Sequence, residues 1–249
     1  MDMTVPENFS VTVVIPVYNE QERIAASLYH IKDYLDKQEY KSNVLVIDDG
    51  SSDMTTEIVK FVDIYGSEFN SQQIGVLEEN VKNVGKGYSI AKGLLLAEGD
   101  IIVFTDADCS TPIFEIDKLI EKIQSGYDVV IGSRHLKGSH VSGRGIGRSC
   151  LSRGFNLIAR LIRLLEVKDS QCGFKAYTRE AARKIAVKQR TYGFCFDVEH
   201  LHIAKKLNCK VTEVPVRWKH DKRSTVSPFS DSLAMLFELL KIRIIHRNL

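Results

Sequence analysis

Short runs of β-branched residues alternate with longer amphipathic stretches through the first half of the chain, and this alternation restricts the possible folds more than any other feature. Four apolar runs are typical of buried strands: residues 11–15, 44–47, 101–104 and 129–131. Three stretches between them carry apolar side chains at spacings of three and four, which predicts helices: residues 20–35, 53–64 and 87–97. Thr111 and Pro112 predict the start of another helix that ends near Gln124. The pattern favours an α/β fold with a mostly parallel central sheet flanked by helices.

The second half of the chain is less regular. Residues 138–147 are rich in Gly and Ser and are expected to form a loop. A helix is predicted over residues 149–165, with four polar residues on one face: Arg153, Asn156, Arg160 and Arg163. Residues 210–218 alternate as a strand does, and residues 233–245 predict an amphipathic C-terminal helix. The sequence shows no repeat, linker or low-complexity segment, so we expect one domain over residues 1–249.

Composition excludes several classes of protein. No apolar run approaches the roughly 18 residues of a membrane-spanning helix. Residues 1–10 have neither a basic nor an apolar region, so no secretion signal is expected. The 5 cysteines are odd in number and widely spaced, which favours free thiols over disulfides or a zinc site. We therefore expect a cytoplasmic protein.

Charge is distributed unevenly along the chain. Residues 1–132 hold 10 basic and 23 acidic residues, a net charge of −13, whereas residues 133–249 hold 24 and 9, a net charge of +15. Residues 133–165 contain no acidic residue but seven basic ones: Arg134, Lys137, Arg144, Arg148, Arg153, Arg160 and Arg163. This asymmetry favours a phosphate or an anionic lipid as a partner of the second half. The alternative is a solvated basic face that pairs with the acidic half.

Acidic residues follow two of the predicted strands closely. Asp48 and Asp49 come after residues 44–47, and Asp106 and Asp108 come after residues 101–104. Ligands of open α/β sheets bind beyond the carboxyl ends of the strands, where these carboxylates would repel one another without a cation. Mg²⁺ and Mn²⁺ prefer oxygen ligands, and Mg²⁺ commonly combines a few carboxylates with substrate phosphates. Asp106 and Asp108 are therefore predicted to bind a metal together with a nucleoside diphosphate, although either pair alone could form only a turn or a cap.

Two further features point to a nucleotide. One carboxylate of Asp48 and Asp49 could accept the N–H of a nucleobase while the other orients the loop, with the Tyr18 ring nearby. Lys86 lies between two glycines just before a predicted helix, where it could meet a phosphate. This segment is not a Walker loop, and no G-x-G-x-x-G motif follows a strand, which argues against a dinucleotide enzyme.

Five segments occur in an order that resembles the inverting glycosyltransferases of family 2, which bind nucleotide sugars in a GT-A fold: VTVVIPVYNE, VLVIDDGSSD, NVGKG, FTDAD and GSR. The later segments DSQCGFK, residues 169–175, and FDVE, residues 196–199, are similar to the dolichyl-phosphate glucosyltransferase branch of this family. The resemblance therefore covers nearly the whole chain. It implies a Rossmann-like nucleotide-sugar-binding half over residues 1–134 and an acceptor half with amphipathic helices over residues 135–249.

The resemblance also implies roles for individual residues. The nucleotide sugar would contact Pro16, Tyr18, Glu20, Val46, Asp48, Asp49, Lys86, Asp106, Ala107 and Asp108. The donor and acceptor phosphates would meet Arg134, Arg148, Arg153 and Lys175. Catalysis would use Asp108, Arg148 and Asp169, the last as a base or an acceptor-orienting carboxylate, unless it only caps a helix or pairs with Lys168 or Lys175. Ser110 stands where related mannosyltransferases have a glutamine metal ligand, so no third protein ligand is expected.

The implied reaction transfers a sugar from UDP-glucose to a polyprenyl or dolichyl monophosphate with inversion and with Mg²⁺ or Mn²⁺. Such a phosphate is largely dianionic at neutral pH and hardly needs a base. The alternatives are UDP-N-acetylglucosamine or GDP-mannose as donor, a hydroxyl acceptor that needs a general base, a nucleotidyltransferase, or a non-catalytic nucleotide- or phospholipid-binding module. No nucleic-acid partner is expected. The helices of the second half would attach peripherally to the anionic cytoplasmic face of a membrane, unless they only pack on the sheet.

Overall fold

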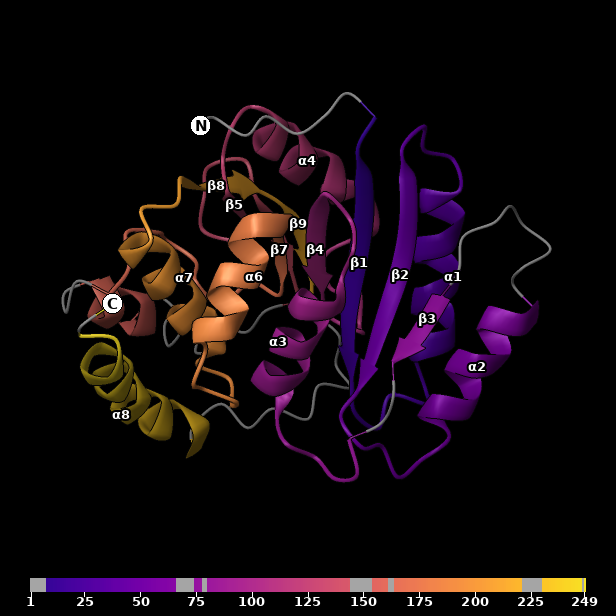
Figure 1. Ribbon diagram of the computed structural model, residues 1–249, viewed down its shortest axis with the longest axis horizontal. Helices are drawn as coiled ribbons and strands as arrows, with labels where there is room; N and C mark the ends of the chain where they lie inside the picture. Colours follow the sequence, from indigo (N-terminus) through magenta and orange to yellow (C-terminus); the bar gives the residue numbers. More distant parts are fainter. Residues whose placement is uncertain are drawn as a thin grey trace.

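The computed structural model describes residues 8–65, 74–77, 80–143, 154–160, 164–220, 230–247 and 249. Among these residues, seven strands form a central sheet in the order β3-β2-β1-β4-β7-β5-β8 (Figure 1). The strands are β1 (Ser10–Val17), β2 (Lys41–Asp48), β3 (Ile74–Leu77), β4 (Ile101–Thr105), β5 (Val129–Ser133), β7 (Phe174–Thr178) and β8 (Val211–Pro215). Only β7 runs antiparallel to its neighbours, β4 and β5. The expected α/β fold with a mostly parallel sheet is confirmed.

Helices cover both faces of this sheet. α3 (Lys86–Leu96) and α6 (Arg179–Lys188) pack on one face, and α7 (Phe196–Lys206) packs against α6. α1 (Ile24–Leu35) and α4 (Ile116–Gln124) cover the other face, with α2 (Thr55–Tyr65) beside α1. Every residue of β4 is buried because both faces of the strand are covered, which explains its uninterrupted apolar sequence.

The strand order reverses at β1. The chain runs outward from β1 through β2 to β3, and then returns to place β4 on the other side of β1. Ligands of open α/β sheets bind beyond the carboxyl ends of the strands at such a reversal. Because β7 is antiparallel, its first residue, Phe174, pairs with Thr105 at the end of β4. The segment before β7 therefore reaches the same edge as the carboxylates that follow β4.

The predicted strand over residues 210–218 is wrong as a single element. β8 ends at Pro215, and β9 (Arg217–Lys219) leaves the main sheet to pair with β6 (His140–Ser142). Pro215 lacks an N–H for a strand ladder, which favours the end of β8 at this residue. Its carbonyl oxygen accepts a hydrogen bond from Lys118 Nζ at 3.1 Å. The expected loop over residues 138–147 is also incorrect in part, because it contains β6.

Two helix predictions also need correction. Residues 154–160 are helical, but Leu164 lies outside a helix, so the predicted helix over residues 149–165 ends early; residues 149–153 lie outside the described residues. Thr111 does not cap a helix. A short 3-10 helix, Ile113–Glu115, precedes α4 and has no side-chain cap.

Candidate active site

The segment Asp106-Ala107-Asp108, called the D-x-D segment below, follows β4 at the carboxyl edge of the sheet. Lys86, the first residue of α3, forms an ion pair with Asp106. Burial and the nearby charge of Asp106 raise the pKa of Asp108, whose Oδ1 accepts the Ser110 N–H at 2.9 Å. Burial lowers the pKa of Lys86, but the carboxylate of Asp106 outweighs this effect and the pKa is raised. The positive charge of Lys86 is therefore favoured at neutral pH.

Gly173 permits a close approach between the two halves of this edge. The backbone N–H of Asp106 donates to the Gly173 carbonyl at 3.2 Å. A Cβ atom added to Gly173 would lie only 1.9 Å from Oδ2 of Asp106. Only glycine therefore allows the segment before β7 to lie against Asp106 in this position.

Asp48 and Asp49 both organise loops. Asp48 is buried and accepts hydrogen bonds from the Ser51 N–H, the Ser51 hydroxyl and the Thr56 hydroxyl. Asp49 accepts from the Asn80 side chain and from two backbone N–H groups, those of Val84 and Gly85, at 3.0 and 2.8 Å. Asp49 thus holds the loop that leads into Lys86, which is the orienting role predicted for one member of this pair.

The other expected nucleotide contacts lie around the end of β1. Tyr18 is 45% exposed at this edge, whereas Pro16 and Val46 are buried in the neighbouring strands β1 and β2. Ala107 is also buried, between the two acidic residues. Glu20 is paired with Arg23 through both carboxylate oxygens.

Lys175, the expected donor-phosphate contact, is fully buried in β7. Its Nζ forms an ion pair with Asp197 and donates to the Cys172 carbonyl at 2.7 Å. Asp197 and Glu199 both come from the FDVE segment at the start of α7. Glu199 accepts the N–H groups of residues 190 and 191, and the next residue, Tyr192, accepts the Gly87 N–H at 2.8 Å. The FDVE segment therefore helps to position both lysines of the site. Asp197 pairs with Lys175, and Glu199 holds the segment that binds the backbone next to Lys86.

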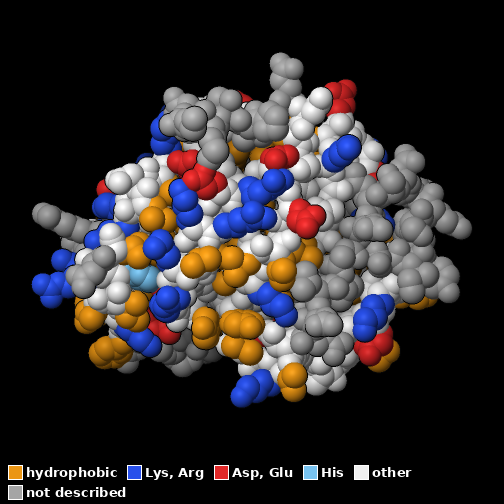
Figure 2. All heavy atoms as spheres, in the orientation of Figure 1, with side chains coloured by type: hydrophobic (Ala, Val, Ile, Leu, Met, Phe, Trp, Pro, Cys, Tyr) orange, Lys and Arg blue, Asp and Glu red, His pale blue; other side chains and the backbone are white. Residues whose placement is uncertain are grey.

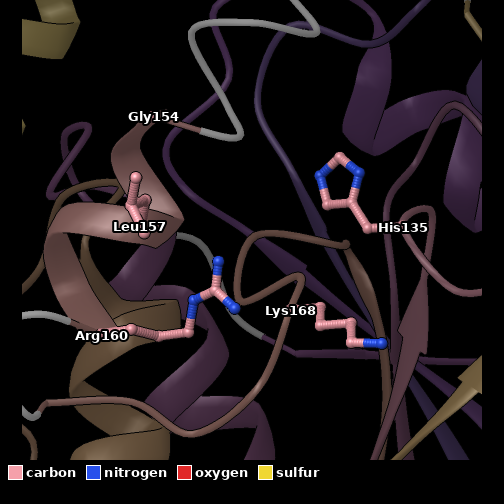
Figure 3. Close-up of a pocket in the computed structure, with 5 residues that line it drawn as sticks. All are labelled: His135, Gly154, Leu157, Arg160 and Lys168. Atoms are coloured by element: carbon pink, nitrogen blue, oxygen red, sulfur yellow. The ribbon is translucent and has the colours of Figure 1, made fainter.

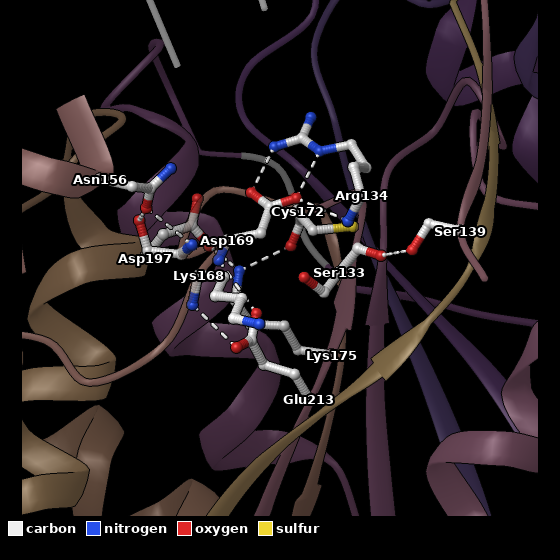
Figure 4. Close-up of polar contacts among 11 residues, drawn as sticks. Ser133, Arg134, Ser139, Asn156, Lys168, Asp169, Cys172, Lys175, Asp197 and Glu213 are labelled. Carbon is white, nitrogen blue, oxygen red and sulfur yellow. Dashed lines mark hydrogen bonds and ion pairs between the residues drawn. The ribbon is translucent and has the colours of Figure 1, made fainter. Parts of the chain in front are cut away.

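Arg134, which follows β5, forms a buried ion pair with Asp169 (Figure 4). The carboxylate accepts the Arg134 backbone N–H at 2.9 Å, Nε at 2.7 Å and Nη2 at 2.8 Å. Burial opposes ionisation of Asp169, but the Arg134 charge and these hydrogen bonds lower its pKa to about 2. Such a weak base accepts a proton poorly at neutral pH. Asp169 therefore forms a salt bridge, but the expected partners Lys168 and Lys175 are wrong, because the partner is Arg134.

Two residues to which the sequence assigns no site role fix the segment around Asp169. Glu213 in β8 accepts the backbone N–H groups of Lys168 and Asp169 at 2.8 and 3.0 Å. Asn156 Oδ1 accepts the N–H and the hydroxyl of Ser170 at 3.0 and 2.7 Å. Figure 4 shows these contacts converging on the segment from two elements. The sequence signal for Glu213 is a single acidic residue within a predicted strand. Asn156 is predicted to lie on a polar helix face, but it is buried.

The acidic pair after β4 fits a hard divalent cation. Both carboxylates are close enough that Asp106 raises the pKa of Asp108, a repulsion that a cation would relieve. Within the described part of the chain, no group of three or more His, Cys, Asp or Glu residues could hold a metal. Asp106 and Asp108 are the described residues that could hold a divalent metal, with oxygens of a diphosphate or of water as the remaining ligands.

Two expected phosphate contacts, Arg148 and Arg153, lie outside the described residues. In the described part of the chain, no helix has the length and apolar character needed to cross a membrane.

The chain is similar to characterised glycosyltransferases. It matches the family described as Glycosyl transferase family 2 over residues 12–186. A dolichyl-phosphate beta-glucosyltransferase of Trichomonas vaginalis is 36% identical over 253 residues, which cover 97% of this chain and 73% of that protein. The dolichyl-phosphate beta-glucosyltransferase of Homo sapiens is 32% identical, with 94% and 74% covered.

Solved structures share the fold. Glucosyl-3-phosphoglycerate synthase from Mycobacterium tuberculosis in complex with uridine-diphosphate has a TM-score of 0.69 and 20% identity, over 94% of this chain and 80% of that chain. The same synthase in complex with Mn²⁺, uridine-diphosphate and glucosyl-3-phosphoglycerate has a TM-score of 0.68 and 20% identity, over 95% and 79%. The expected GT-A fold is thereby confirmed. Because the family match spans well over half of the sequence and the curated relatives exceed 30% identity over most of it, the chain belongs to glycosyl transferase family 2 and is a glycosyltransferase.

Proposed function

We propose that this glycosyltransferase transfers glucose from UDP-glucose to a polyprenyl or dolichyl monophosphate, with inversion at the sugar carbon. The observation that carries the proposal is the junction of two charged groups at one sheet edge. Gly173 brings the D-x-D segment, Asp106 to Asp108, against the segment that begins with Asp169. Asp169 in turn pairs with Arg134, which follows β5. A donor diphosphate and an acceptor phosphate could thus approach each other across this junction. The names of the curated relatives support dolichyl phosphate as the acceptor class.

The donor end of the site would lie at β1, β2 and β4. Tyr18 offers an exposed ring for the nucleobase, and Asp48 keeps room for a further donor because a carboxylate has about four acceptor positions. Mg²⁺ or Mn²⁺ held by Asp106 and Asp108 would supply Lewis-acid stabilisation of the diphosphate leaving group. Lys86 is held in place by the loop on Asp49 and would add a second positive charge. These residues bind and neutralise the leaving group without any proton transfer.

The acceptor end needs an oriented phosphate more than a base. A phosphate monoester already carries about 1.5–2 negative charges at neutral pH, so it can attack without losing a proton. Asp169 would orient the Arg134 guanidinium, which would in turn bind an acceptor oxygen. A hydroxyl acceptor would instead require a general base, and the lowered pKa of Asp169 makes it poorly suited to that role.

The outer face of α8 (Ser230–Ile245) would rest on an anionic membrane. Leu239 and Ile242 are buried against the protein, whereas Phe237, Leu240 and Ile244 are 68%, 52% and 73% exposed. Exposed basic residues flank this stripe: Lys241, Arg243 and Arg247. Figure 2 shows apolar and basic side chains side by side at its lower left, over α8. An apolar stripe flanked by cations suits the headgroup region of a cytoplasmic leaflet, where both kinds of contact are stabilising.

The decisive experiment incubates the protein with UDP-glucose, a short polyprenyl phosphate and Mn²⁺, and identifies the lipid product by mass. The expected product is a glucosyl phosphate lipid with UDP released. UDP-N-acetylglucosamine, GDP-mannose and a hydroxyl-bearing glycan serve as competing substrates. Asp106→Asn and Asp108→Asn should each remove nearly all turnover, because coordination of the diphosphate contributes several kcal/mol. Glucose transfer to the glycan but not to the lipid phosphate would refute the proposal.

A further inference from the structure

A second cluster of positive charge lies beside the ion pair of Arg134 and Asp169. A pocket of about 340 Å³ is lined by five described residues: His135, Gly154, Leu157, Arg160 and Lys168. Figure 3 shows Leu157 and Arg160 on one side of it, on the helix over residues 154–160, and His135 and Lys168 on the other. We call it the basic pocket. None of these five lining residues is acidic, so the pocket suits an anion.

The pocket is chemically amphiphilic. Arg160 and Lys168 are exposed cations, and Arg160 Nε donates to the Asn156 carbonyl at 3.3 Å, which directs the side chain along its helix. Leu157 is half exposed on the same side of the pocket. Arg160 beside an exposed leucine, with Lys168 across the pocket, matches a ligand with a phosphate at one end and an apolar chain at the other (Figure 3).

The walls of the pocket are fixed by hydrogen bonds, of which those between Asn156 and Ser170 are buried. Glu213 holds the backbone N–H of Lys168, and the buried Asn156 joins the helix to Ser170 through two hydrogen bonds. The two walls therefore cannot separate without breaking these bonds. Preorganisation of this kind lowers the entropy lost when a ligand binds.

The basic pocket also adjoins the site described above. His135 follows Arg134 in the chain, and Lys168 precedes Asp169. Two of the five lining residues are therefore the immediate chain neighbours of the ion pair between Arg134 and Asp169.

We propose that the basic pocket binds the acceptor phosphate through Arg160 and Lys168, with Leu157 as the first contact for its apolar chain. This inference rests on the proposed function, because it names the acceptor subsite of that same reaction. It assigns binding to Arg160, Lys168 and Leu157, to none of which the motif resemblance gives a role.

The test measures binding of a short, water-soluble prenyl phosphate by calorimetry, without donor. Arg160→Ala and Lys168→Ala should each raise its Kd about tenfold, the usual effect of losing a hydrogen bond to a charged group. The Kd for UDP with Mn²⁺ should change less than twofold. Arg160→Lys and Lys168→Arg should restore part of the affinity because they keep the charge. Arg183→Ala, an exposed change of equal charge on α6, is the matched control and should leave both affinities unchanged.

A second arm separates a lipid phosphate from a soluble one. Leu157→Ser should weaken prenyl phosphate binding several-fold and leave the affinity for inorganic phosphate unchanged. Equal effects on both probes, or none, would overturn the apolar contact. If the wild type binds and glucosylates prenyl phosphate while the Arg160 and Lys168 variants bind it normally, the pocket assignment fails and the proposed function stands. If the wild type binds UDP but neither binds nor glucosylates prenyl phosphate, the proposed function itself fails.

Discussion

Replacing Asp169 by Asn should destabilise the protein measurably and without a large change of shape. Three hydrogen bonds join the carboxylate to Arg134, and both side chains are nearly or fully buried. The pKa of Asp169 is about 2, roughly two units below its ordinary value, and each unit corresponds to about 1.4 kcal/mol. The variant should therefore lose about 3 kcal/mol of unfolding free energy at pH 7, at the lower end of the range for breaking a buried ion pair.

The assay is urea unfolding followed by circular dichroism at several pH values. A carboxyl group whose pKa is lowered by folding stabilises the protein above its unfolded pKa, near 4, and this contribution disappears as the pH falls toward 2. The difference between wild type and variant should thus be full at pH 7 and small near pH 2.5. In thermal unfolding, about 3 kcal/mol corresponds to a fall in Tm of about 6–12 °C for a domain of this size.

A double-mutant cycle isolates the pair. In an Arg134→Met background, Asp169→Asn should cost much less than in the wild type, with a coupling energy of about 2–3 kcal/mol. A loss below about 0.5 kcal/mol at pH 7, the size of an ordinary surface change, would refute the reasoning that this pair is buried and strongly coupled.

Three further predictions concern other parts of the structure. Gly173→Ala should weaken binding of UDP with Mn²⁺ at least tenfold by calorimetry, because its Cβ would lie 1.9 Å from Asp106 Oδ2; unchanged affinity would contradict the close approach. Asp49→Ala should release the loop that leads into Lys86 and cost about 1–3 kcal/mol of stability, since it leaves partly buried N–H groups without their acceptor; hydrogen exchange at Val84 should rise, and unaltered protection would count against it. Burial lowers the pKa of His200 to about 3, so the unfolded state binds a proton that the folded state does not. Stability should fall as the pH drops below 6.5, by up to about 1.4 kcal/mol per unit, and His200→Leu should flatten this slope in urea unfolding; an equal slope would disprove the assignment.

The sequence predicted the strands whose residues are buried on both sides, because β1, β2, β4 and β5 are continuous apolar runs. It did not predict β7, which contains a lysine and a tyrosine. Lys175 is tolerated there only because Asp197, far along the chain, pairs with it, and periodicity cannot detect such a contact. The short β3 was missed as well, since four residues carry little periodic signal.

The candidate site was likewise only partly predictable from the sequence. Strand-end acids could be placed at one edge from the sequence, because parallel strands end together. Their partners could not be derived. Lys86 on Asp106 and Arg134 on Asp169 are contacts across 20 and 35 residues, and they depend on the path of loops between the strands. Glu213 and Asn156 accept backbone N–H groups, so their partners could not be derived from the sequence, even though the acid of Glu213 stands out in its strand.

The position of β7 in the sheet has a consequence for folding during synthesis on the ribosome. β4 and β5 leave the exit tunnel early, yet the strand that joins them, β7, begins only at Phe174. Until that segment emerges, the nascent sheet has open inner edges, and such edges invite pairing with other chains. Pairings between distant segments also form slowly. A ribosomal pause before Phe174 would therefore prolong the interval in which the nascent protein is most prone to aggregate.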